Sequence, residues 1–225
     1  MHPPYPVTAV RPIRTVAYLA IAGLTLTSLV AVAMIVGELY AIALVHRLRT
    51  APELVAQMEI DTFNNAAALL EKARRYSYIL AAVLFLVWLM RARSNAESLV
   101  PVPHRHAEAW GIFGWAPVVN LWIPKRFADD IWSASQPGGL RTGSLRTEPR
   151  SGLIWAWWLT WLLATYLAMT PRFMAYGVDA LGVEISGLAL SVAAAVLASA
   201  VILKITAAQE IGRRWETSSV ISVDS

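Results

Sequence analysis

Four long apolar stretches divide the chain. They cover residues 16–45, 76–90, 153–169 and 185–205, and polar segments separate them. A helix rises about 1.5 Å per residue and a bilayer core is about 30 Å thick, so about 20 apolar residues cross it. The first stretch is long enough to tilt, and the second needs residues from the helix before it. The pattern predicts an all-α polytopic membrane helix bundle with four spanning helices.

Residues 46–75 predict an amphipathic helix on the outer side that leads into the second span. Apolar and small side chains recur in it three and four positions apart, which places them on one face of a helix. They are Val55, Met58, Thr62, Ala66, Leu69 and Ala73. We expect this face to pack on the bundle or to rest on the membrane surface, and a ligand-binding cap is the alternative.

Residues 110–123 form an apolar run that is too short to span a bilayer. Glycines and prolines interrupt its helical regularity at Gly111, Gly114, Pro117 and Pro124. We expect an interfacial or re-entrant segment rather than a fifth span. A helix should begin at Pro124 and end near Ser135, which completes a Trp/Pro/Asn element at 110–135. The polar residues 136–152 predict a linker, and residues 170–184 an outer loop.

Composition and charge agree with a membrane protein. Hydrophobic residues make up 57% of the chain and charged residues 15%, whereas a soluble chain has about 25% charged residues. The net charge of +4 comes from cations that flank the apolar stretches, so it does not indicate nucleic-acid binding. Arginine outnumbers lysine 16 to 3 in an alanine-rich chain, which favours a GC-rich bacterial source.

The distribution of cations predicts the topology. With four spans and the N terminus inside, the cytoplasmic segments are 1–15, 91–152 and 206–225. Together with Lys204 at the inner end of the last span, they carry 13 of the 19 Lys and Arg residues. The outer segments carry the remaining 6. Because basic loops stay in the cytoplasm, we expect a multi-pass protein of the bacterial plasma membrane with both termini cytoplasmic.

The Trp/Pro/Asn element contains the first candidate site. Asn120 lies between Pro117 and Pro124, where its amide can pair with backbone groups that the prolines leave unpaired, or can contact a ligand. Its neighbours Trp115, Trp122 and Trp132 can anchor at the interface or line a pocket for an apolar or cationic ligand.

Three acidic residues are further candidates. Asp129 and Asp130 form a pair that can bind a cation or transfer a proton, but a solvated helix face with Arg126 as partner explains them more simply. Glu38 interrupts the first apolar stretch, where an ionisable group is either functional or held at the outer interface.

Catalytic and metal-binding patterns are missing from the sequence. The chain has no cysteine, no Gly-x-Ser-x-Gly elbow, no P-loop and no HExxH motif. His104 and His106 have the spacing of some metal ligands but lack a clear third ligand. We expect no metal and no cofactor, and the pattern favours a protein that is not an enzyme.

Several segments resemble one known family. They are Arg-Ala-Arg-Ser-Asn at 91–95, Gly-Trp-Ala-Pro-Val-Val-Asn-Leu-Trp-Ile-Pro at 114–124, Trp-Ser-Ala-Ser at 132–135 and Thr206-x-x-Gln209. Together they resemble the bacterial domain of unknown function 4328 family, in which an aromatic or aliphatic residue often stands in place of Ala116. The resemblance extends from the end of the first span to the C terminus. It implies a multi-pass membrane protein and no particular reaction.

The leading hypothesis is a membrane interaction or scaffold protein that uses the 110–135 element to dock lipid headgroups or a protein partner at the cytoplasmic face. The alternative is a small-molecule transporter with a re-entrant element at Pro117 to Pro124. A membrane enzyme using the histidines and aspartates of the cytoplasmic face comes third. The bilayer is the expected partner, nucleic acid is not, and the sequence leaves self-association open.

Overall fold

The computed structural model describes the chain from residue 10 to residue 221. Residues 101, 103, 105, 116–120, 137–139, 141–142, 146–147 and 171–177 are outside this description, as are the side chains of Val178 and of residues 215–221. Throughout the described residues the regular structure is helical, without strands. This confirms the predicted all-α class.

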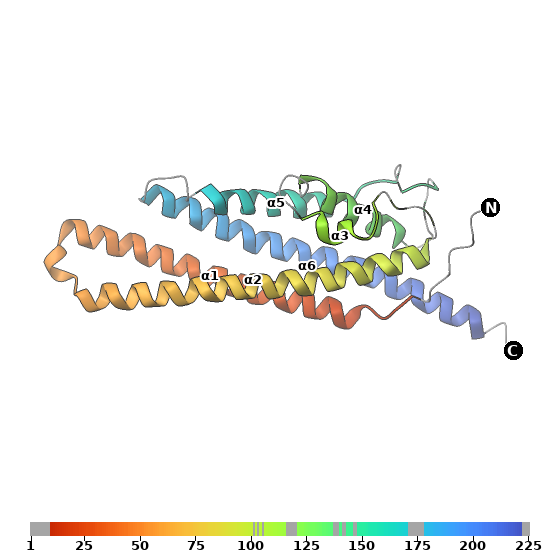
Figure 1. Cartoon of the computed structure of the whole chain (residues 1–225), viewed down its shortest axis with the longest axis horizontal. Helices are drawn as coiled ribbons and strands as arrows, with labels where there is room; N and C mark the ends of the chain where they lie inside the picture. Colours follow the sequence, from red (N-terminus) through yellow and green to blue (C-terminus); the bar gives the residue numbers. More distant parts are fainter. Residues whose placement is uncertain are drawn as a thin grey trace. The chain divides into compact units, whose positions relative to one another are not determined.

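Four long helices dominate the chain (Figure 1). They are α1 (Arg14–Thr50), α2 (Gln57–Leu99), α5 (Gly152–Met169) and α6 (Val178–Ile221). The short 3-10 helix η1 (Pro52–Leu54) connects α1 to α2. Each long helix contains a stretch long and apolar enough to cross a membrane, which confirms the predicted count of four.

Two helices are longer than the apolar pattern indicates. α2 contains the predicted outer helix and the second span as one element, because no proline or glycine interrupts residues 57–99. α6 has no proline after residue 178 and continues to Ile221, through most of the segment predicted as a polar tail. Thr206, Gln209 and Glu210 in that segment are buried.

The predicted amphipathic face of α2 does not pack on the rest of the described chain. Met58, Thr62, Ala66 and Leu69 are exposed, with Met58 at 77%. The partly buried side contains Ile60, Phe63 and Leu70 instead. Of the two expected places for this face, packing on the bundle does not hold for these four residues, and contact with the membrane surface stays a prediction.

The chain forms two compact units. Unit 1 contains residues up to Ile21, Val83–Ala156 and residues from Ala198 onward. Unit 2 contains Ala22–Ala82 and Trp157–Leu197. The short helices α3 (Trp110–Phe113) and α4 (Ile123–Ala134) belong to unit 1.

Unit 2 has a small apolar core between α1, α2 and α6. Ala31, Met34 and Leu188 are buried there, with Leu70 and Val192 packed against them. α6 also approaches α5 closely at Gly187. A Cβ atom on Gly187 would lie 3.3 Å from the backbone nitrogen of Ala168 and 3.4 Å from the Cβ of Leu167. Small residues allow such contacts between spanning helices.

A polar cluster closes the α1–α2 hairpin in unit 2. Glu59 accepts hydrogen bonds from Tyr40 and from Arg47, and Arg47 also lies 3.4 Å from the Tyr40 hydroxyl. The ring of Tyr40 contacts that of Phe63, with 5.7 Å between centroids. Because Tyr40 and Arg47 are exposed to the surroundings, solvent weakens this ion pair and it contributes little to stability.

The Gly187 contact can be tested by substitution. Gly187→Leu should destabilise the protein by about 1–3 kcal/mol, because the new side chain meets the α5 backbone. Gly182→Leu is the matched control, since a Cβ atom at Gly182 of the same helix meets nothing within 4 Å. Thermal unfolding in detergent measures both. Equal melting temperatures for the two variants would contradict the close contact.

Candidate functional site

The Trp/Pro/Asn element packs closely within unit 1 through two glycines. A Cβ atom on Gly111 would lie 2.7 Å from the sulfur of Met90 on α2 and 3.0 Å from the ring of Phe127 on α4. A Cβ atom on Gly114 would lie 2.7 Å from the side chain of Ile123. The two glycines therefore permit α3 to pack against α2 and α4.

Helix α4 spans Ile123–Ala134, within one residue of the predicted start at Pro124 and end near Ser135. Pro124 occupies the first turn, where its missing N–H group leaves no hydrogen bond unmade. Ser135 ends the helix, and its backbone N–H and hydroxyl both donate to the carbonyl of Ile131. Phe127 and Ile131 are fully buried, so one side of α4 faces the interior of unit 1.

The aspartate pair of α4 is buried, which corrects the interpretation of a solvated face. Asp129 is 2% exposed and Asp130 is fully buried. Asp129 accepts a hydrogen bond from Lys125 at 2.6 Å, and the Lys125 ammonium lies 3.8 Å from the ring centroid of Trp155. A buried charge needs such a partner because its desolvation is costly.

A second buried cation comes from the end of α2. The side chain of Arg93 is 3% exposed and donates hydrogen bonds to Glu97 at 2.9 Å and to the carbonyl of His106 at 3.0 Å. Its guanidinium lies 5.0 Å from the ring centroid of Phe127. Asp130 interacts with it electrostatically. Arg93 thereby connects α2 to α4 and to the loop before α3.

A network of carboxamides forms the centre of unit 1. Gln209 of α6 is fully buried, and its Nε2 donates to the Ala92 carbonyl at 2.8 Å and to the Ser135 hydroxyl at 2.9 Å. Its Oε1 accepts a hydrogen bond from Nδ2 of Asn95 at 3.2 Å. Asn95, 1% exposed, uses its other polar groups on the backbone of Arg11. One network thus joins α2, α4, α6 and the N-terminal segment.

One turn earlier, Trp88 repeats the connection between α2 and α6. Its indole N–H donates to the hydroxyl of Thr206 at 3.2 Å, and the ring is 1% exposed. Trp88 also contacts Phe85, with 5.5 Å between ring centroids. A buried indole needs a hydrogen-bond acceptor, and Thr206 provides it.

The three candidate tryptophans occupy different environments. Trp115 is half-buried, donates to the Gly111 carbonyl at 2.9 Å and packs edge-on against Phe85. Trp122 precedes α4 and is 43% exposed. Trp132 lies on α4 and is half-buried. Pro117 and Asn120 lie outside the described residues, so their role stays a prediction.

Glu38 lies in unit 2, apart from the network. It is half-buried on α1 and interacts electrostatically with Glu184 of α6, which also interacts with Arg74 of α2. Glu184 immediately precedes the apolar stretch of α6, and Arg74 lies two residues before that of α2. This supports a place for Glu38 at the outer interface, and a binding role for it stays a prediction.

No metal centre is found in the part of the chain that the structure describes. There, no three His, Asp or Glu side chains gather to hold an ion. The arrangement described above holds α3 and α4 against the ends of the long helices in unit 1.

Sequence reasoning identified the residues of the network only as parts of a family pattern. A more local signal was present, because Ile202, Ile205 and Gln209 recur at helical spacing on the buried side of α6. Trp88, Ala92 and Asn95 do the same on α2. A polar residue that continues a buried apolar stripe predicts a buried hydrogen-bonding partner.

The network predicts a large effect of a small change. Gln209→Ala should lower the free energy of unfolding by about 2–4 kcal/mol, because Asn95, Ser135 and the Ala92 carbonyl each lose a buried partner. Gln57→Ala, the same substitution at an exposed helix position, should change it by less than about 0.5 kcal/mol. Denaturant titration followed by circular dichroism measures both. A Gln209→Ala protein as stable as Gln57→Ala would refute the assigned role.

Comparison with known families shows that one family model covers most of these elements. The family model described as Domain of unknown function (DUF4328) matches residues 50–207. Comparisons with curated proteins and with solved structures give no match. The matched range holds α2 to α5 and the first part of α6, including Asn95 and Ser135, and ends two residues before Gln209. Because it covers more than half of the chain, the protein belongs to the DUF4328 family, with four helices able to span a membrane.

Proposed function

We propose that this protein is a scaffold of the bacterial plasma membrane whose α3–α4 element docks lipid headgroups at the cytoplasmic face. The observation that carries the proposal is the contrast between the two sides of this element. Its inner side is held by Gln209, Arg93 and close glycine contacts. Large apolar side chains of α3 and of the residues just before α4 are exposed to the surroundings: Trp110, Ile112, Phe113, Leu121 and Trp122.

Those exposed side chains suit a membrane interface. Phe113 is 68% exposed, Ile112 52% and Trp122 43%. Apolar groups of this size in water would be unfavourable by about 25 cal/mol per Å² of exposed area. At the boundary of a bilayer the aliphatic side chains enter the acyl region, and indole rings lie at the headgroups.

The charge around the element supports anionic headgroups as the ligand. Arg126 on α4 and Arg91 at the end of α2 are both solvent-accessible cations on the same unit. The excess of 13 over 6 cations in the predicted inner segments supports the cytoplasmic side, where anionic lipids attract basic residues. No described feature favours the transporter alternative.

The absence of cysteine makes the docking directly testable by labelling. Phe113→Cys, coupled to an environment-sensitive fluorophore in nanodiscs containing anionic lipid, should show blue-shifted emission and quenching by spin-labelled lipid. Glu53→Cys in η1 is the control, since Glu53 is exposed next to the α1–α2 hairpin and predicted to be outside. It should emit as in water.

The same pair of labels separates the alternatives. Water-like emission at Phe113, with iodide quenching equal to that at Glu53, would contradict lipid docking and favour a protein partner on this surface. Labelling of Glu53→Cys in intact cells by a membrane-impermeant maleimide, without labelling of Ser144→Cys, is expected for the proposed topology. The reverse labelling would contradict it.

A further inference from the structure

The N-terminal segment Val10–Ile13 lies against unit 1 in the way that a bound peptide lies in a receptor. The Oδ1 atom of Asn95 accepts a hydrogen bond from the backbone N–H of Arg11 at 2.9 Å. The Nδ2 atom of the same side chain donates to the backbone carbonyl of Arg11, also at 2.9 Å. One buried carboxamide therefore binds both polar groups of a single backbone residue, independent of that residue's side chain.

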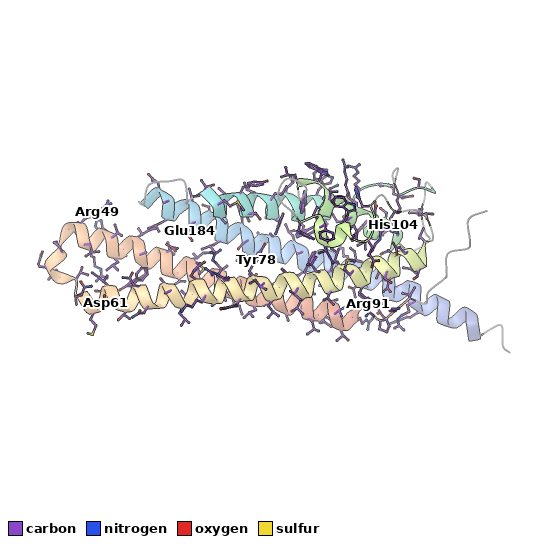
Figure 2. All side chains as sticks on the ribbon, in the orientation of Figure 1. Arg49, Asp61, Tyr78, Arg91, His104 and Glu184 are labelled. Atoms are coloured by element: carbon purple, nitrogen blue, oxygen red, sulfur yellow. The ribbon has the colours of Figure 1, made fainter. Side chains whose placement is uncertain are left out.

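The flanking backbone groups are bound as well. Arg91, labelled in Figure 2, lies 3.4 Å from the carbonyl of Pro12 through its guanidinium. The N–H of Ile13 donates to Oε1 of Glu210 at 3.3 Å. Glu210 is 4% exposed and accepts a second hydrogen bond, from Arg213, at 2.9 Å. Side chains of α2 and α6 thus satisfy the backbone of three successive residues.

The first and last side chains of the segment are buried, and the two between them are exposed. Val10 is 7% exposed and Ile13 is 1% exposed, while Arg11 and Pro12 are exposed. A three-residue spacing of buried side chains fits an extended, polyproline-like conformation, which Pro12 favours in itself and in the residue before it. The segment thus has the pattern apolar-x-Pro-apolar, in which the two apolar side chains are buried and the proline favours the extended backbone.

The receptor groups are held in place by contacts that do not involve the segment. Asn95 is oriented by Gln209, and Gln209 by the Ala92 carbonyl and the Ser135 hydroxyl. Glu210 is oriented by Arg213 of the same helix. A set of binding groups held in such a fixed arrangement binds a peptide at a lower entropic cost.

We propose that unit 1 carries a binding groove for an extended peptide, formed by Asn95, Arg91 and Glu210, whose resident ligand is the protein's own Val10–Ile13 segment. Its second ligand is a segment of another protein with the same apolar-x-Pro-apolar chemistry, on the side of the membrane where the N terminus lies. The tether gives the resident segment an effective concentration in the millimolar range. The partner therefore binds when the resident segment is released. This inference does not depend on lipid docking by α3 and α4.

The test uses the full chain in nanodiscs and a fluorescent peptide with the sequence of residues 10–15, capped at both ends. The V10D/I13D variant should weaken the resident segment, because it places charges in two buried anchor positions. Fluorescence anisotropy should show saturable binding to V10D/I13D, and binding to the unmodified chain weaker by about tenfold or more. V10D alone replaces the double variant if the latter does not fold.

Modified peptides provide controls that leave the protein unchanged. N-methylation at the position of Arg11 removes the N–H group that Asn95 accepts from, so the affinity should fall by about tenfold or more. Glutamine in place of the arginine side chain should keep the affinity within about twofold, because Arg11 is exposed.

Two results would overturn the proposal. The first is a folded V10D/I13D protein that does not bind the peptide, or that binds the N-methylated peptide equally well. The second is that light scattering shows a dimer of the unmodified chain and a monomer of the V10D/I13D variant. The segment would then be exchanged between two copies of the chain rather than displaced by another protein.

Discussion

The fold of unit 1 depends on the rule that a buried polar group must have a hydrogen-bonding partner. A single hydrogen bond stabilises a protein by only about 0.5–1.5 kcal/mol, but a buried group left without one costs about 1–3 kcal/mol. Gln209 of α6 binds three partners, two on α2 and one at the end of α4. Any movement of α2, α4 or α6 away from the others would leave at least one of these groups unsatisfied, and the surrounding apolar side chains offer no replacement.

The same rule applies to the buried charges of α4 and of the end of α2, which have partners of opposite charge. Lys125 pairs with Asp129 and lies over the ring of Trp155. Arg93 donates to Glu97 and to a backbone carbonyl, and its guanidinium lies over the ring of Phe127. Lys125, Asp129 and Asp130 of this element are buried, whereas Phe113 and Trp122 are exposed and can make contacts outside the chain. The polar network and the exposed aromatic surface are thus two consequences of one arrangement, which is the basis of the proposed scaffold function.

Sequence patterns predicted the long helices well because hydropathy over about 20 residues depends little on tertiary contacts. They also located the α4 boundaries, since Pro124 and Ser135 act locally. They predicted a solvated Asp129–Asp130 face wrongly, because its burial comes from tertiary packing, with Arg93 of α2 near Asp130 and Trp155 of α5 next to the Lys125–Asp129 pair. Likewise, no periodicity could show that Asn95 pairs with Arg11, 84 positions away. The sequence pattern placed Met58 and Leu69 on one apolar face of α2, but it could not show that no other part of the described chain packs on these two side chains.

The central claim is that the Asn95–Gln209 pair holds the segments of unit 1 together. A double-mutant cycle tests it most directly, with unfolding free energies measured for Asn95→Ala, Gln209→Ala, the double variant and the unmodified chain. Because the two carboxamides share one network, the account predicts a coupling energy of about 0.5–3 kcal/mol, so that the second substitution costs less than the first. Strictly additive effects, with no coupling beyond experimental error, would contradict it.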